Sequence, residues 1–261
     1  YAEWTSRGKD GDAERALLEA GLVDPDPIVR RTAAEGLAEL GDAGSAEALA
    51  NLLSDADPAV RRTAARALED LNTAPPTTEA LAVQLVETQK IAEAVNQCGA
   101  AAVPPLVRAL RQRQVSEQVS AAWGLGLLPP ELAGEETVAA LITALRSDYP
   151  GVRVQVAESL GRLGFEAAIE PLVTSLDDAD LDVRTEAGAA LLAIGEPGHL
   201  ALVAALSAAT AEGRAAAASA LANITGGRVE AEPQLVVLLS SDEDAGVRAA
   251  AATALATLPT A

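Results

Sequence analysis

An alternating run of carboxylates at residues 177–182, with the sequence DDADLD, is the densest group of side chains that could do chemistry. Carboxylates at every second position begin the Ca²⁺ loops of helix–loop–helix sites, because a hard cation takes several oxygen ligands. The rest of such a loop does not follow, since, counted from Asp178, its sixth position is Val183 rather than Gly and its twelfth is Ala189 rather than Glu. We therefore interpret the run as a solvated turn that caps the next helix.

His199 and Cys98 are the only residues of their types. A transition-metal site needs several His or Cys ligands at short spacing, and an activated nucleophile needs a base beside it. Neither pattern occurs, and the sequence has no glycine-rich phosphate loop or Gly-x-Ser-x-Gly elbow. We interpret His199 as a surface or packing residue and Cys98 as a small buried hydrophobe. The sequence thus predicts no catalytic residue, no cofactor site and no metal site.

An Asp-Pro-x-Val-Arg motif is the most regular polar feature of the chain. One copy runs from Asp26 to Arg30 and another from Asp57 to Arg61, so that the two arginines lie 31 positions apart. Both copies continue into Arg-Thr-Ala-Ala and a later Leu. Self-similarity at such a period is typical of solenoids, in which each unit packs on its neighbours. Weaker copies contain Arg153, Arg184, Arg214 and Arg248.

Each copy carries signals for the start and the end of a helix. Asp26 suits the N-cap and Pro27 the first helical position, where its missing N–H costs nothing. Apolar residues follow at helical spacing, and Gly41 can adopt the left-handed conformation that ends a helix. A second apolar helix follows, as in residues 46–53. The repeat unit is therefore predicted to be a hairpin of two short helices.

The period and the Asp-Pro-x-Val-Arg motif closely resemble the short HEAT-like repeats named after phycobilisome lyases, in the HEAT/armadillo superfamily. The resemblance covers roughly residues 11–258. It implies an all-α fold, an α-α superhelix or solenoid of about eight hairpins, in a single array over residues 1–261 with incomplete terminal repeats. It also implies a structural ladder in which an Arg of one unit reaches an Asp of a neighbouring turn. The predicted ladder residues are Asp26, Arg30, Asp57, Arg61, Arg153, Arg184 and Arg248.

Residues 75–134 interrupt the repeat. The Val-Arg consensus is lost there, and two proline pairs, at residues 75–76 and 129–130, stand where short Gly-Asp turns are expected. The stretch also holds the densest positive run of the chain, formed by Arg108, Arg111 and Arg113. Three interpretations stay open: a change of superhelical curvature, a local docking patch, or ordinary decay of the repeat.

The charge balance bears on the partner class. Nineteen Lys and Arg residues stand against 38 Asp and Glu residues, which gives a formal net charge of −19. Such a field repels nucleic acid and anionic membranes, so we expect a protein partner, and a basic one fits best. We expect a cytoplasmic protein, with export left open because the chain begins at Tyr1 and contains no Met. The oligomeric state is not predicted.

The leading functional hypothesis is a non-catalytic scaffold that binds a protein, because the family resemblance implies that second helices line a concave groove. One alternative is a phycobilin lyase-type subunit, since the segment around Trp123 resembles part of those proteins; another is a structural component of a larger assembly. The predicted partner-binding residues are Glu47, Asn51, Arg108, Arg111, Thr143, Arg146, Glu170, Thr174 and His199.

Overall fold

The computed structural model describes residues 2–41, 43–73, 75, 77–112, 114–208, 210–224 and 231–257, with side chains from residue 12 onward. These residues form α-helices and short 3-10 helices, with no strand among them. The predicted all-α solenoid of helical hairpins is therefore confirmed. The chain groups into two compact units, Tyr1–Pro105 and Leu106–Ala261, which are described separately. A single array over the whole chain stays a prediction.

Unit 1 is built around the two complete Asp-Pro-x-Val-Arg motifs. Helix α2 packs on α4, and α4 packs on α5. Their shared core is aliphatic, with Leu37, Leu49, Leu53 and Leu68 almost wholly buried. The helices of this unit are α1 (Ala2–Gly21), α2 (Pro27–Leu40), α3 (Ala46–Asn51), α4 (Pro58–Asp70), α5 (Thr78–Glu87) and α6 (Ile91–Cys98), while α7 (Val103–Leu110) begins here and ends in unit 2.

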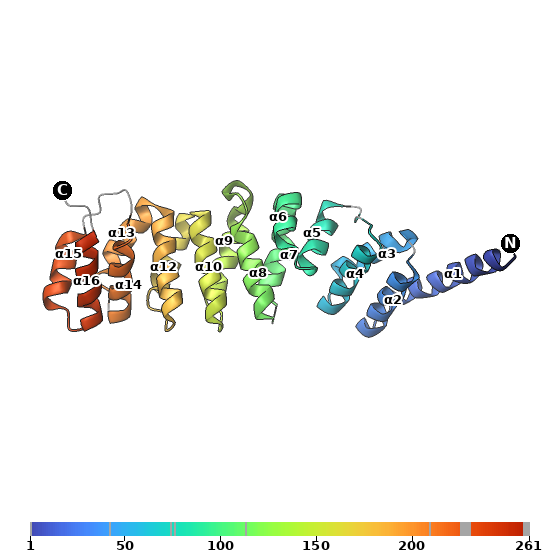
Figure 1. Cartoon of the computed structure of the whole chain (residues 1–261), viewed down its shortest axis with the longest axis horizontal. Coiled ribbons are helices and arrows are strands. Elements are labelled where there is room, and N and C mark those ends of the chain that lie inside the picture. Colours follow the sequence, from blue (N-terminus) through green and yellow to red (C-terminus); the bar gives the residue numbers. More distant parts are fainter. Residues whose placement is uncertain are drawn as a thin grey trace. The chain divides into compact units, whose positions relative to one another are not determined.

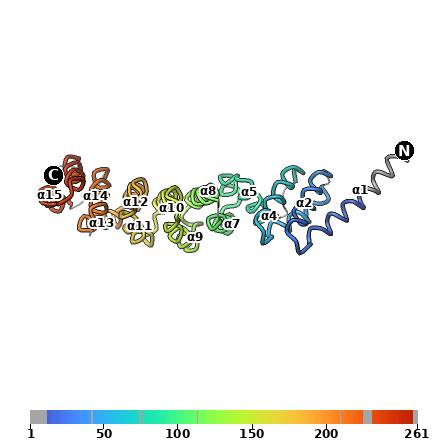
Figure 2. The backbone as a smooth tube through the Cα atoms, turned by 90° about the horizontal axis from the view of Figure 1, so that it is seen from below, coloured from blue at the N-terminus to red at the C-terminus, as the bar shows by residue number. Residues whose placement is uncertain are grey.

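Unit 2 has two layers of helices. The first helices of successive hairpins, α8, α10, α12, α14 and α16, pack in that order (Figure 1), and Figure 2 shows α8, α10, α12 and α14 along one side with α9, α11 and α13 along the other. Their bounds are α8 (Val115–Gly126), α9 (Pro130–Ala144), α10 (Pro150–Leu163), α11 (Ile169–Ser175), α12 (Leu181–Ile194), α13 (Glu196–Ala205), α14 (Ala211–Leu221), α15 (Glu232–Ser241) and α16 (Ala245–Thr257).

Helices begin and end where the motif predicts. The Asp26 carboxylate accepts a hydrogen bond from the Ile28 amide at 2.8 Å at the start of α2. Gly41 ends that helix with φ +68°, a left-handed conformation that suits glycine because it has no Cβ. In this unit the capping residues of the motif therefore set the length of α2, the helix that carries Arg30.

Small residues let the first helices of unit 2 approach closely. A Cβ on Gly161 of α10 would lie 2.7 Å from the Ala190 Cα of α12, and one on Gly188 of α12 would lie 2.7 Å from the Ala220 Cβ of α14. Such contacts leave no room for larger side chains at these positions. Glycine and alanine at these positions thus allow neighbouring first helices to pack at short distance.

The segment 75–134 is irregular in the described structure as well. The boundary between the two units lies within it. Gln89 has φ +63° between α5 and α6, and Gly134 interrupts α9 with φ +63° and ψ +173°. Two residues of the segment that the sequence singled out, Pro76 and Arg113, lie outside the described residues.

Candidate functional site

An arginine near the start of a first helix pairs with an aspartate in the turn before the next first helix. In unit 2, Arg153 of α10 donates from Nε and Nη2 to the two carboxylate oxygens of Asp178, each at 2.7 Å. Both side chains are only 14% exposed. Such a forked pair combines two charge-assisted hydrogen bonds. The same fork joins Arg30 to Asp55 at 2.7 and 2.9 Å and Arg214 to Asp242 at 2.7 and 3.0 Å.

Each fork is one part of a larger hydrogen-bonded unit, which we call a rung. The Arg153 Nη1 donates to the Ser147 carbonyl at 2.8 Å, and Asp178 accepts the Asp180 amide at 2.9 Å. Burial raises the pKa of Asp178, but hydrogen bonds from Arg153 and the Asp180 amide outweigh this effect and lower the pKa. The hydrogen bond with Asp178 raises the pKa of Arg153. A rung therefore fixes both charges and ties two turns together.

The pairing aspartate lies two residues before the helix cap, which corrects one detail of the predicted ladder. Asp57, predicted as a ladder residue, caps α4 by accepting the Ala59 and Val60 amides. Asp55 instead pairs with Arg30. Asp26 likewise caps α2. The cap carboxylate already has its donors, so the earlier aspartate is the one that the arginine of the neighbouring helix reaches.

Arg61 uses a carboxylate from a helix rather than from a turn. Its Nε donates to Glu87 Oε1 at 2.8 Å, and the two side chains are 5% and 6% exposed. This pair lies deeper than the other rungs, at the edge of the irregular segment. A buried ion pair of this kind strongly penalises loss of one partner.

The first two junctions of unit 2's first-helix layer differ in charge. Between α8 and α10, Gln118 occupies the arginine position and donates to the Gln112 carbonyl at 2.7 Å. Ser147 occupies the aspartate position and accepts the Tyr149 amide at 3.3 Å. The α8–α10 junction thus has a neutral pair in place of the Arg153–Asp178 rung between α10 and α12.

The junction between α12 and α14 keeps the arginine but not the aspartate. Arg184 donates from Nη1 to the Asp178 and Ala179 carbonyls at 2.6 and 3.0 Å. Thr210 caps α14, and Ala208 occupies the position two residues before this cap. Across the described ranges, no carboxylate pairs with Arg184. Arg248 of α16 makes the same two backbone contacts, to Asp242 and Glu243, and also has no carboxylate partner in the described part of the chain.

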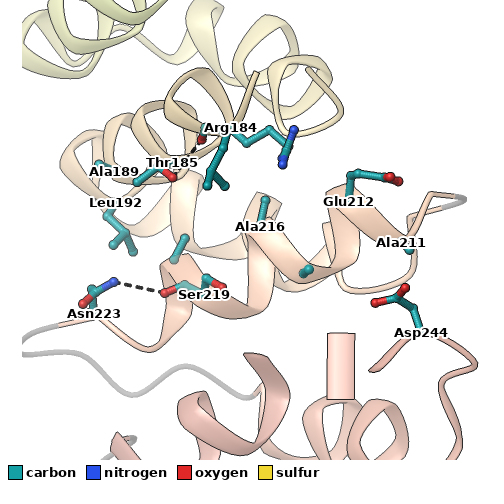
Figure 3. A pocket seen from close by; sticks show the side chains of 13 residues that line it. Arg184, Thr185, Ala189, Leu192, Ala211, Glu212, Ala216, Ser219, Asn223 and Asp244 are labelled. Atoms are coloured by element: carbon teal, nitrogen blue, oxygen red, sulfur yellow. Dashed lines mark hydrogen bonds between the residues drawn. The ribbon is translucent and has the colours of Figure 1, made fainter. Parts of the chain in front are cut away.

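A groove of about 390 Å³ lies between α12 and α14 (Figure 3). Its floor is made largely of alanines and Leu192. Figure 3 shows Arg184 on the rim, with its nitrogen end toward the side where Glu212 lies. Asn223 lines the opposite part, where it donates to the Ser219 carbonyl at 3.0 Å. The groove is therefore apolar at its base and charged at one end.

A second groove, of about 420 Å³, lies between α11 and α13 in the layer of second helices. Ile169, Val173 and Leu176 form part of its wall, and the carboxylates of Glu170 and Asp177 line it. Both acidic residues are exposed. This groove offers apolar contact area with negative charge beside it.

The predicted partner-binding residues lie on the second helices or, for Arg111 and Arg146, in the turns that follow them, and they are spread over both units. Only Glu170 lines the α11–α13 groove. Arg108 and His199 are half-buried, and the His199 Nε2 lies 3.2 Å from the Leu192 carbonyl oxygen. The exposed members are Glu47 and Asn51 in unit 1 and Arg111, Thr143, Arg146, Glu170 and Thr174 in unit 2.

The side chains with possible metal or nucleophilic chemistry have structural contacts. In the 177–182 run, Asp178 belongs to a rung, Asp180 caps α12, and Asp177 accepts a hydrogen bond from the Thr210 hydroxyl. Cys98 is buried, and burial raises the pKa of its thiol. Within the described ranges, no three His, Cys, Asp or Glu side chains are grouped as metal ligands.

Comparison with known protein families identifies the type of these repeats. HEAT repeats match residues 15–93 and 103–193. The chain belongs to the HEAT-repeat family. The match does not distinguish the phycobilisome lyase subtype, and no curated protein matches the chain. Among the helices that the structure describes, none has the length and apolar character needed to cross a membrane.

Several solved structures are similar to this HEAT-repeat chain. An engineered protein from a structural genomics consortium is 26% identical with a TM-score of 0.41, covering 94% of this chain and 78% of its own. A computationally designed armadillo repeat protein for modular peptide recognition is 21% identical, with a TM-score of 0.45 and coverages of 81% and 98%. Human deoxyhypusine hydroxylase in complex with glycerol is 22% identical, with a TM-score of 0.38 and coverages of 84% and 89%.

Sequence reasoning did not single out the α12–α14 junction of the HEAT array. It assigned Arg184 to the structural ladder with the other arginines. The signal that distinguishes it is one residue, because Ala208 stands where the equivalent turns have Asp55, Asp178 or Asp242. Aligning the turns on their helix caps reveals the substitution.

Proposed function

We propose that this HEAT-repeat protein is a non-catalytic scaffold that binds a partner protein through its layer of second helices. HEAT and armadillo repeats generally serve as protein-interaction scaffolds. The observation that carries the proposal for this chain is the α11–α13 groove, which combines an apolar wall with two exposed carboxylates. A concave site of this size and composition suits a side chain or short segment of another protein.

The groove is shaped for small or slender apolar side chains. Ala201 and Ala204 of α13 face Val173 of α11 across it. Leu200 of α13 is 63% exposed, and Val237 of α15 is 60% exposed. Neither side chain lines the groove, but exposed aliphatic side chains on the second helices favour protein contact, since covering them removes apolar area from water.

Charge favours a basic partner. The net charge of −19 attracts cations at long range, and Glu170 and Asp177 place negative charge at the groove itself. Complementary charge accelerates association and aids specificity more than it adds affinity. Binding is therefore expected to weaken and to slow as ionic strength rises, because salt screens exposed charges over about 8–10 Å.

The proposed contact set extends beyond this groove. Arg108 and Arg111 form a separate positive site in α7 and the turn after it, suited to an acidic part of the same partner. The remaining proposed contacts are Glu47, Asn51, Thr143, Arg146, Thr174 and His199.

Affinity capture from a cytoplasmic lysate of the source organism tests the proposal; the single Cys98 is compatible with that reducing compartment. The wild-type chain is compared with Glu170→Lys, which reverses charge at the α11–α13 groove, and with Glu212→Lys, which makes the same change at the α12–α14 groove. A specific partner is expected with wild type and Glu212→Lys and is expected to be lost with Glu170→Lys. Equal recovery with both variants would exclude this groove as the binding face, and a parallel Arg108→Glu/Arg111→Glu variant tests the positive site.

A further inference from the structure

The turn before α14 lacks a carboxylate that the turns before α12 and α16 contain. Asp178 lies two residues before the α12 cap, and Asp242 lies two residues before the α16 cap. Each accepts hydrogen bonds from an arginine of the preceding first helix and from the amide of its own cap residue. At α14 the cap is Thr210, and Ala208 occupies the carboxylate position.

The arginine and the cap amide, which bind this carboxylate at the other junctions, are left without an acceptor at the α12–α14 junction. The Nε and Nη2 of Arg184 have no acceptor among the described residues, and neither has the Thr210 amide. In the complete rung, Arg153 and the Asp180 amide donate to the same carboxylate. The α12–α14 junction therefore holds three donors whose equivalents converge on one carboxylate.

Arg184 is already fixed in position. Its Nη1 donates to the Asp178 and Ala179 carbonyls, as Arg30 does to its own turn. A ligand would not have to order this side chain, which lowers the entropic cost of binding. The N-terminal end of α14, where the helix dipole favours an anion, already has the Asp177 carboxylate beside it, so Arg184 is the group that remains for a ligand.

The nearby carboxylates do not occupy the position. Asp177 accepts the Thr210 hydroxyl and forms no ion pair with Arg184. Glu212 and Asp244 line the groove and are exposed. They disfavour a ligand with many acidic groups and favour a positive charge next to a single carboxylate.

We propose that Arg184 and the Thr210 amide bind an aspartate or glutamate side chain of a partner protein, whose neighbouring residues lie along the α12–α14 groove. The alanine floor of the groove accepts small apolar residues, and Glu212 and Asp244 accept a basic one. The partner carboxylate takes the place that Asp178 has in the complete rung. This site goes beyond the proposed function because Arg184 lines the α12–α14 groove and not the α11–α13 groove, although Ala208 borders the latter.

The test is a peptide titration of the full chain, followed by NMR through the ¹⁵N-labelled arginine Nε–H signals. The probe is acetyl-Ala-Ala-Asp-Ala-Lys-amide, which is neutral overall and so gains nothing from long-range attraction. Its Asn analogue carries a net positive charge and is the stringent control. The signal of Arg184 is assigned by its loss in Arg184→Lys, and Arg248, with the same backbone contacts but no place in the groove lining, is the internal control.

A saturable shift of the Arg184 signal is expected with the Asp probe, with binding about tenfold weaker for the Asn analogue. Ala208→Asp, which supplies the carboxylate from within the chain, is expected to abolish the shift, and Arg184→Gln to abolish peptide binding measured by isothermal titration calorimetry. The proposal is overturned if Arg184 and Arg248 respond alike, if the Asn analogue binds as tightly, or if Ala208→Asp still binds. Free acetate binding as tightly as the peptide would also overturn it, because the groove would then contribute nothing.

Discussion

The α10–α12 and α12–α14 junctions of unit 2 have the same architecture, but only the first has a carboxylate opposite its arginine. At the first, Arg153 meets Asp178 in a forked pair; at the second, Arg184 stands opposite Ala208. Both arginines are held by backbone carbonyls of their own turn. The comparison shows two roles for the motif arginine. In a complete rung it ties two helices together, and in an incomplete rung its donors are left for another molecule.

The α8–α10 junction shows that a rung can be lost without leaving an unmatched charge. There both members are replaced, by Gln118 and Ser147, and each finds a local hydrogen bond. At the α12–α14 junction only the carboxylate is replaced, by Ala208, and the arginine stays. This distinguishes the junction from the α8–α10 junction, where both members of the rung are replaced.

The largest expected difference between the junctions is in stability. Arg153→Ala should lower the free energy of unfolding of unit 2 by about 3 kcal/mol, because it leaves the mostly buried Asp178 without its partner. Arg184→Ala should cost only about 1 kcal/mol, since it removes hydrogen bonds to backbone carbonyls. Urea unfolding followed by Trp123 fluorescence, in a Trp4→Phe background, measures both. Equal losses would mean that the two junctions do not differ as described.

Acid should remove the contribution of the complete rung. The lowered pKa of Asp178 means that the rung's stability is present above the unfolded pKa of about 3.9 and is lost as pH falls through the folded pKa. The stability difference between wild type and Asp178→Asn is therefore expected to hold at neutral pH and to shrink below about pH 4. Urea midpoints from pH 7 to pH 2 measure it. A gap that persists at pH 2 would assign the effect to packing rather than to charge.

The smallest expected effect concerns Glu186 of α12, on the helix shared by both junctions. Burial raises its pKa, nearby Glu158 raises it further, and Arg162 partly opposes both. Because the folded pKa lies above the unfolded one, the ionised side chain destabilises the fold at neutral pH. Glu186→Gln should stabilise unit 2 by a few tenths of a kcal/mol at pH 7, with the gain vanishing below about pH 4. Destabilisation at pH 7, measured by the same urea midpoints, would contradict this.

Much of the fold could be predicted because its signals are local. The cap at Asp26, the proline at residue 27 and the glycine at residue 41 define a helix without reference to any distant contact. The choice between Asp55 and Asp57 as the partner of Arg30 could not be predicted, since both lie in one turn and the answer depends on the direction from which the arginine approaches.

The grooves could not be read from the sequence, because they depend on the spacing between helices rather than on any residue pattern. The α12–α14 groove is lined by five alanines among other residues, and sequence reasoning assigns such alanines to the core. Glu170 was predicted as a contact residue, and the structure adds the groove that it lines. The division into two units also had no local signal beyond the irregularity of residues 75–134.

The most direct test is a double-mutant cycle between positions 208 and 184. Stability of unit 2 is measured for wild type, Ala208→Asp, Arg184→Gln and the double variant, with Ala208→Asn as the uncharged control. We expect a coupling free energy of about 1–2 kcal/mol that stabilises the chain when the aspartate of Ala208→Asp and Arg184 are present together, because the new carboxylate can complete the rung. A coupling within about 0.3–0.5 kcal/mol of zero would show that the Arg184 donors do not converge on that position, and would contradict the account.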